Sequence, residues 1–231
     1  MFDFVSGETI LVDKPLQWTS FDVVNKLRST IKRKLNIKKI KVGHAGTLDP
    51  LASGLLIVCT GKRTKTIEEL MAQTKEYTGS ILLDQSRSSL DFETEIDKLF
   101  DVSELSSERI ETLAESFVGE QMQKAPMFSA KRVDGKKLYD YAREGKEFTV
   151  KEHLVNIHEF EITSCNLPQI DFRLKCSKGT YVRSLARDFG AQLGVGGVLS
   201  SLRRTAIGDY NIQDSKALNS LLKAIEDAEF E

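Results

Sequence analysis

The chain has 231 residues, enough for one domain or at most two with a sizeable hydrophobic core. Hydrophobic residues make up 40% and charged residues 29%. No signal peptide is visible and no apolar run is long enough to cross a bilayer, so we expect neither a secreted nor a membrane-spanning protein. The net charge of −1 does not mark the whole chain as a nucleic-acid-binding protein.

The first predicted elements are a strand, a helix and a turn-rich loop that leads into a buried strand. Ile10–Val12 form the strand, and Ser20 caps a helix with apolar residues at helical spacing. These apolar residues are Phe21, Val24, Leu27, Ile31 and Leu35. Residues 43–54 form the loop, because they combine glycines with a proline, and Leu55–Cys59 form the buried strand.

A short helix over residues 66–71 and a strand over residues 77–83 come next. The polar and acidic residues 84–103 are predicted to form an exposed excursion. Ser106 or Ser107 then begins a helix that Gly119 ends. The apolar residues of this helix are Ile110, Leu113 and Phe117.

The rest of the chain predicts a mobile insertion at residues 120–148, followed by regular elements. Alternating apolar residues over 170–176 predict a half-buried strand, and a helix follows Thr180. A strand over 205–210 and a helix capped by Asp214 close the chain. Strands and helices are mixed without regular βαβ alternation, so residues 1–231 predict a single α/β (α+β) domain.

Basic residues are segregated despite the neutral total. Residues 26–41 hold eight lysines and arginines without an acid between them, and residues 124–137 hold five more. The acids concentrate in residues 91–120 and in the C-terminal tail. Segregation of this kind gives a positive face that a polyanion can find, and a solvated helix face is the alternative interpretation.

Cysteine and histidine spacing indicates neither disulfides nor a metal. The three cysteines form no CxxC pair and fall in apolar runs, so we expect buried free thiols and a reducing cytoplasm. Separately, we expect a monomeric chain. The three histidines show no ligand spacing with them. The residues concerned are Cys59, Cys165, Cys176, His44, His153 and His158. For His153 and His158 we expect only structural roles.

The loop over residues 43–54, Gly-His-Ala-Gly-Thr-Leu-Asp-Pro-Leu-Ala-Ser-Gly, is the most informative stretch. Three glycines and a proline specify a backbone conformation, and the buried strand that follows gives Asp49 a rigid support. A simple Asp-Pro turn is the alternative interpretation.

The same loop resembles the signature of the TruB family, the tRNA pseudouridine-55 synthases of bacteria. Further motifs match in order from about residue 7 to residue 215. They are residues 13–15, 75–77, 126 with 128–130, 135 with 138–139, 177–183 and 202–205. The resemblance implies a mixed, largely antiparallel sheet flanked by helices with a cleft across it. It also indicates a short form, because the chain ends where many relatives continue into a PUA domain.

The resemblance implies that a uridine becomes pseudouridine with Asp49 as the catalytic carboxylate, without a cofactor or a metal. Whether Asp49 attacks C1′, attacks C6 or initiates a glycal route stays open. Arg183, in the first turn of its helix where the dipole disfavours a cation, is expected to pair with Asp49 and keep it ionised. A surface arginine is the alternative.

The resemblance also supplies the residues around the base. Tyr77 matches the active-site tyrosine that stacks on the flipped uracil and accepts a proton late, although without the family a tyrosine there is more often core. His44 fills space near the base, and Tyr181 and Leu202 line the pocket. Lys14 is a candidate to orient the tyrosine or to contact phosphate.

The basic segments would then grip the T-arm of tRNA, supplying affinity and position but no sequence choice. The expected contacts within the insertion are Lys124, Lys131, Arg132 and Lys136, and the 26–41 cluster extends the track. Two departures from the family pattern matter here. Residues 84–89 replace a glycine followed by threonines, and Ala125 replaces the first proline of a Pro-Pro pair.

Two other functions remain open. One is an RNA-binding folding helper in which catalysis is secondary or absent. The intact Asp49, Tyr77 and Arg183 argue against lost catalysis. The other is the catalytic subunit of a guide-RNA particle, whose members carry a PUA domain and partner-docking extensions that this sequence does not show.

Overall fold

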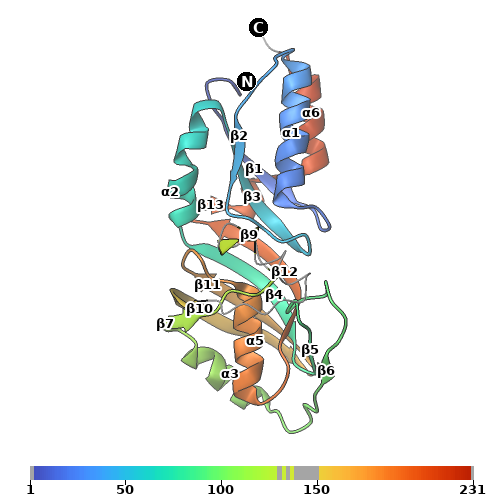
Figure 1. Cartoon of the computed structure of the whole chain (residues 1–231), viewed down its shortest axis with the longest axis vertical. Coiled ribbons are helices and arrows are strands. Elements are labelled where there is room, and N and C mark those ends of the chain that lie inside the picture. Colours follow the sequence, from blue (N-terminus) through green and yellow to red (C-terminus); the bar gives the residue numbers. More distant parts are fainter. Residues whose placement is uncertain (1–2, 129–131, 134–135, 138–150, 230–231) are drawn as a thin grey trace. The chain divides into compact units, whose positions relative to one another are not determined.

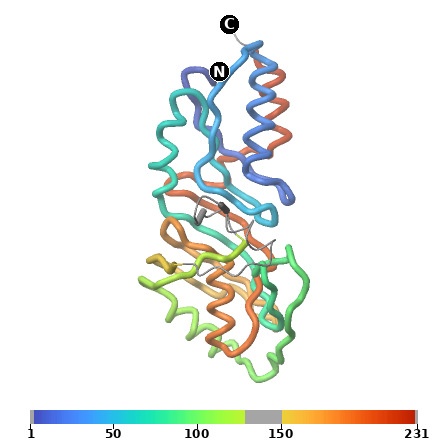
Figure 2. Tube along the Cα trace, in the orientation of Figure 1, coloured from blue at the N-terminus to red at the C-terminus, as the bar shows by residue number. Residues whose placement is uncertain are grey.

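The computed structural model describes residues 3–128, 132–133, 136–137 and 151–229. Its contacts divide the chain into two compact units, residues 1–77 with 202–231 and residues 78–201. In the first unit, segments from the two ends of the sequence fold together (Figure 2). No helix in the described part of the chain is long and apolar enough to span a membrane.

The first unit is a mixed sheet carrying helices. Its main strands follow the order β14-β1-β3-β12. In addition, β2 pairs with β3 and β13 pairs with β12. The strands are β1 (Thr9–Lys14), β2 (Val42–Ala45), β3 (Ala52–Thr60), β12 (Val198–Ile207, from Leu202 onward in this unit), β13 (Tyr210–Asn211) and β14 (Lys216–Ala217). The helices are α1 (Ser20–Lys34), α2 (Ile67–Ala72) and α6 (Leu218–Asp227), with short 3-10 turns at Gly61–Thr66 and Ile212–Asp214.

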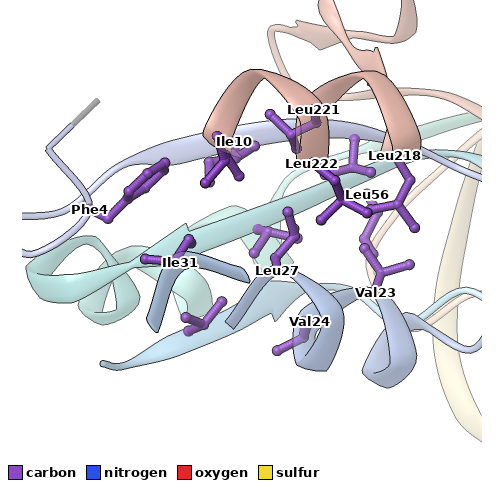
Figure 3. Close-up of a cluster of buried hydrophobic side chains, with 14 residues drawn as sticks. Phe4, Ile10, Val23, Val24, Leu27, Ile31, Leu56, Leu218, Leu221 and Leu222 are labelled. Carbon is purple, nitrogen blue, oxygen red and sulfur yellow. The ribbon is translucent and has the colours of Figure 1, made fainter. Parts of the chain in front are cut away.

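Strand β3 is the centre of this unit, because both of its faces are buried. Leu56 and Val58 pack into a cluster beneath α1 and α6, which lie side by side (Figures 1 and 3). Leu55, Ile57 and Cys59 point to the opposite face, where Leu70 of α2 packs. A strand buried on both faces gives a rigid anchor to the end of the loop that precedes it.

Two predicted caps in the first unit are wrong. Thr19, not Ser20, caps α1, and it forms a reciprocal capping box with Asp22. The hydroxyl of Ser20 instead donates a hydrogen bond to the carbonyl of Leu48, 28 residues further along the chain. Asp214 ends the second 3-10 turn, and α6 begins after Ala217 without a side-chain cap.

The second unit is an antiparallel sheet packed against two helices. Its strand order is β4-β11-β10-β7, and Ser200 of β12 donates to Ser80 O of β4. The elements are β4 (Lys75–Leu82, from Thr78 onward in this unit), β5 (Gln85–Ser86), β6 (Lys98–Leu99), α3 (Ser107–Ser116), β7 (Gly119–Gln123), β8 (Arg132–Val133), β9 (Lys136–Lys137), β10 (His153–Asn166), β11 (Gln169–Cys176) and α5 (Val182–Leu193). Phe160 contacts Phe117, Phe172 and Phe189 edge to face, which joins the sheet to both helices.

The predicted fold class, a mixed and mainly antiparallel sheet with helices, is confirmed. Four local predictions are wrong. Residues 42–45 form a strand, so the loop is shorter than predicted. The segment 84–103 is not uniformly exposed, because Ser89 and Asp91 are buried. Phe21 is exposed while its neighbour Val23 fills the core, and Cys165 is only partly buried.

The predicted insertion at residues 120–148 falls largely outside the described residues. Its beginning belongs to β7, which pairs with β10 from Gly119 to Gln123. Strand β10 itself was not predicted, because its apolar residues do not alternate regularly along the sequence.

Candidate active site

The loop that carries Asp49 runs from Gly46 to Leu51, and other elements of the first unit hold its backbone. The buried hydroxyl of Ser20 donates to Leu48 O at 3.0 Å and accepts from Leu48 N at 2.8 Å. The amide of Gln17 donates to Pro50 O at 2.8 Å, and the amide of Ala52 donates to Asp49 O at 3.1 Å. Asp49 is half-buried. These hydrogen bonds fix the backbone on both sides of it.

Strand β12 supports the same loop from the side. It pairs in parallel with the start of β3, with Leu202 opposite Ala52 and Arg204 opposite Gly54. This register places the predicted pocket residue Leu202 beside the strand that begins three residues after Asp49. Leu202 and Asp49 therefore belong to one locally ordered region of the first unit.

Two predicted site residues, Lys14 and His44, lie within electrostatic reach of this loop. Lys14 ends β1, is fully buried and donates to the carbonyls of Pro15 and Trp18 at 3.0 and 2.6 Å. Burial lowers the pKa of Lys14 to about 8, although Asp49 raises it. Both donations are to carbonyl oxygens of the chain, so this lysine holds the turn after β1.

His44 approaches the loop from β2. Its Nε2 lies 3.2 Å from the hydroxyl of Thr47. Burial lowers the pKa of His44, and the positive charge of Arg204 lowers it further. Because the usual pKa is already below 7, His44 is neutral at neutral pH.

Arg183 is buried at the start of α5, and in the second unit it faces a carboxylate that the sequence did not single out. Its Nη1 lies 3.3 Å from Oδ2 of Asp91 and donates to Ser89 O at 3.0 Å, while Nη2 donates to Phe128 O at 2.8 Å. The carboxylate offsets the helix dipole that disfavours a cation in the first turn. The alternative of a surface arginine is wrong, since the side chain is 6% exposed. The pairing of Arg183 with Asp49 stays a prediction.

Tyr181 precedes α5 and is held by Gln123 of β7. The Tyr181 amide donates to Oε1 of Gln123 at 2.8 Å, and Nε2 of Gln123 donates back to Tyr181 O at 3.2 Å. The ring of His153 meets the ring of Tyr181 edge to face at 5.9 Å, so His153 has a packing role. Tyr77 is the third residue of β4 and is 8% exposed.

Comparisons with known proteins decide the family. The model of the TruB family pseudouridylate synthase N-terminal domain matches residues 32–182, and the model of the tRNA pseudouridylate synthase B C-terminal domain matches residues 183–230. The chain belongs to the TruB family. The predicted family membership is thus confirmed.

Relatives of this TruB-family chain match it over nearly their whole length. It is 50% identical to tRNA pseudouridine synthase B of Flavobacterium johnsoniae, over 92% of this chain and 93% of the relative. Identity is 48% with the enzyme of that name from Phocaeicola vulgatus, over 99% and 97%. It is 50% with the one from Chloroherpeton thalassium, over 95% and 90%.

Solved structures similar to the TruB-family chain include the archaeal box H/ACA sRNP Nop10–Cbf5 complex, at 26% identity and a TM-score of 0.67. A Cbf5–Nop10–Gar1 complex matches at 27% identity and a TM-score of 0.69. These matches cover 96% and 95% of this chain but 54% of each solved chain, so the chain spans about half of their length.

The basic segments of this TruB-family chain differ in their partners within the chain. Lys124 is exposed, with Glu152 at 3.6 Å, whereas Arg33 and Lys34 of α1 bind Glu226 at the end of α6. Lys131 lies outside the described residues. Arg132 and Lys136 are described only as members of the paired strands β8 and β9.

The buried Lys14 predicts a pH dependence of stability. Its folded-state pKa, about 8, lies below the usual 10.5, so between these values the unfolded chain binds a proton that the folded chain has released. We expect the unfolding free energy of wild type relative to Lys14→Met to rise with pH across this window, by at most roughly 1.4 kcal/mol per pH unit, and to be flat below it.

This pH dependence can be measured by urea denaturation between pH 7 and pH 10. The single tryptophan, Trp18, lies in the same unit and reports unfolding by fluorescence. Replacing the exposed Lys223 by methionine controls for the loss of one positive charge. A wild-type minus Lys14→Met difference that stays constant from pH 8 to pH 10 would contradict the prediction.

Proposed function

We propose that this protein isomerises uridine 55 in the T-loop of tRNA to pseudouridine, with Asp49 as its catalytic carboxylate. The observation that carries the proposal is the Asp49 loop. Its backbone is held by Ser20, Gln17 and Arg204, in a chain 50% identical to an enzyme named tRNA pseudouridine synthase B. A fixed loop supports catalysis because the reacting carboxylate needs no reordering when substrate arrives.

The reaction rearranges one nucleotide. The N1–C1′ glycosidic bond breaks, the uracil turns, and a C5–C1′ bond forms. A proton leaves C5 and another is gained at N1, so atoms and electrons balance without an oxidant, a reductant or water as a reactant. Asp49 would form the transient covalent bond to the sugar or the base, or would initiate elimination at the sugar.

The other residues would bind and orient the base. Arg183 would keep Asp49 ionised, and Tyr77 would stack on the flipped uracil and accept the late proton. The neutral His44 would pack near the base, while Tyr181 and Leu202 line the pocket. Lys14, whose ammonium is occupied by two carbonyls, would act through the turn after β1 rather than by contacting phosphate.

The proposal is tested with unmodified tRNA transcript carrying tritium at C5 of uridine. Because C5 loses its hydrogen when it bonds to C1′, wild type is expected to release one tritium per tRNA and to leave pseudouridine in the T-loop. A transcript with cytidine at position 55 should release none. Binding without any tritium release would overturn the proposal and favour an RNA-binding folding helper.

The insertion is proposed to grip the T-arm backbone, which predicts a salt-dependent defect. Reversing the charge at both Lys131 and Arg132 to glutamate should weaken tRNA binding and reduce the slope of log Kd against log salt by about one for each phosphate that these side chains neutralise. The rate at saturating tRNA should change little. Charge reversal of the exposed adjacent pair Lys62 and Arg63 provides the matched control. An unchanged slope in the first variant would remove these residues from the RNA footprint.

A cytoplasmic, monomeric enzyme is part of the same proposal. Cys59 and Cys176 are buried free thiols, as expected for a chain in a reducing compartment. Analytical ultracentrifugation of the purified protein would test the monomeric state through its molar mass in solution.

A further inference from the structure

Arg204 is the largest side chain that is fully buried in the described part of the chain, and it is 1% exposed. It lies on β12 opposite Gly54. Its Nε donates to Leu55 O at 2.8 Å, and its Nη2 donates to Gly46 O at 3.0 Å. The two accepting carbonyls stand on either side of Asp49, one at the start of the loop and one in β3.

Burying a guanidinium is costly unless hydrogen bonds replace its water. Within the residues that the structure describes, no carboxylate forms an ion pair with Arg204, so carbonyl oxygens carry this task. Its neighbour Arg203 differs, because it is part-exposed and pairs with Asp13 at 2.7 Å. A buried cation bound to loop carbonyls is a specific arrangement that a packed apolar residue could not reproduce.

Two glycines of the loop signature fit around Arg204. Gly46 has a φ of +82°, and a Cβ added there would lie 3.4 Å from Nη1 of Arg204. Gly54 has a φ of +101°, and a Cβ added there would lie 2.3 Å from the Arg204 carbonyl oxygen. Both positive φ values favour glycine, and at Gly54 the close approach of the β12 backbone does so too, so the loop signature fits around β12 at Arg204.

The charge of Arg204 also reaches the predicted site residues. Burial is the main cause of the lowered pKa of His44, and the charge of Arg204 is the second cause. The same charge contributes to the lowered pKa of Lys14. Asp49 acts on Lys14 in the opposite direction. Lys14 therefore lies within electrostatic reach of both Asp49 and Arg204.

We propose that Arg204 is a positioning residue for the isomerisation: its guanidinium ties Gly46 to Leu55 and so fixes the loop that presents Asp49. The inference rests on the proposed function of Asp49. Without Arg204 the loop would keep its bonds to Ser20 and Gln17, so it would remain folded but less well aimed. Small misplacement of a reacting group lowers the rate of the chemical step more than the affinity for substrate.

The test compares Arg204→Gln, Arg204→Lys and Gly46→Ala with wild type in single-turnover tritium release at saturating tRNA. We expect Arg204→Gln to react about 100-fold more slowly with a tRNA Kd within about threefold of wild type. Arg204→Lys, which restores the charge and one donor, should recover part of the rate. Gly46→Ala strains the loop at the residue whose carbonyl Arg204 holds, because alanine disfavours the positive φ of Gly46, and it should give the same split between rate and Kd.

Arg109→Gln is the matched control, because it removes a guanidinium that donates to a backbone carbonyl, Leu193 O, in the second unit. It should leave the single-turnover rate unchanged. A folded Arg204→Gln with the wild-type rate, or one whose defect lies only in Kd, would overturn the inference. If Arg204→Gln does not fold, wild-type rates in Arg204→Lys and Gly46→Ala would overturn it instead.

The same assay separates this inference from the proposed function. An active Asp49→Asn would overturn the role of Asp49, and an inactive wild type would overturn the reaction; either result removes the basis for Arg204 as well. An active wild type, an inactive Asp49→Asn and a fully active Arg204→Gln would overturn the positioning role alone.

Discussion

Replacing Asp49 by asparagine is expected to abolish pseudouridine formation while tRNA binding is nearly unchanged. Asparagine has the same shape but lacks the negative charge that a nucleophile or a base requires, and loss of such a group costs at least about 10⁴-fold in rate. The hydrogen bonds from Ser20, Gln17 and Arg204 reach the loop backbone, so asparagine leaves them in place. Phosphate contacts elsewhere dominate the affinity for RNA.

The measurement combines tritium release from C5-labelled tRNA with a filter-binding Kd. Asp209→Asn, which neutralises an exposed carboxylate of the same unit, is the control and should behave as wild type. Residual activity of Asp49→Asn within tenfold of wild type would show that another group is the catalytic carboxylate. A large loss of binding would indicate that Asp49 holds the RNA instead.

Local periodicity could be read from the sequence because it depends only on neighbouring residues. The helical spacing of Val24, Leu27 and Ile31 and the alternation over β11 both match buried faces. The loop before β3 was also predictable, since Gly46 at its start and Gly54 in β3 need backbone angles that other residues rarely adopt. These features place Asp49 on its loop without any knowledge of tertiary contacts.

The structural features that the sequence did not predict depend on contacts between residues that are distant in the sequence. Thr19 and Ser20 can both cap a helix, and the choice depends on Leu48, which occupies the Ser20 hydroxyl. The two arginines of residues 203–204 look alike in the sequence, yet one is part-exposed and the other fully buried. Only the positions of their partners on β1, the loop and β3 distinguish them.

Asp91 illustrates the same limit for the site. It lies in a polar, acidic segment, which is typical of an exposed excursion. It is buried because the guanidinium of Arg183, distant in the sequence, supplies a partner. The resemblance to the family did not help, because residues 84–89 immediately before it depart from the family pattern.

Asp91→Asn is expected to destabilise the second unit strongly. Both side chains of the Asp91–Arg183 pair are less than a tenth exposed, and breaking a buried pair by removing one partner costs about 3–5 kcal/mol. Asparagine can still accept from the Glu93 amide, which donates to Oδ1 at 3.0 Å, but it places an uncharged amide against Nη1 of Arg183. The bonds of Arg183 to Ser89 and Phe128 remain, so the lower end of that range is expected.

Urea denaturation followed by far-ultraviolet circular dichroism measures this effect, because the single tryptophan lies in the other unit. Glu161→Gln provides the control within the second unit. It breaks an ion pair with Arg173 whose side chains are about half exposed, and such pairs contribute at most about 1 kcal/mol. A loss of stability in Asp91→Asn no larger than in Glu161→Gln would show that Arg183 is held without the Asp91 carboxylate. A large loss would mean that the Asp91 carboxylate fixes Arg183 at the start of α5, where the catalytic proposal needs it.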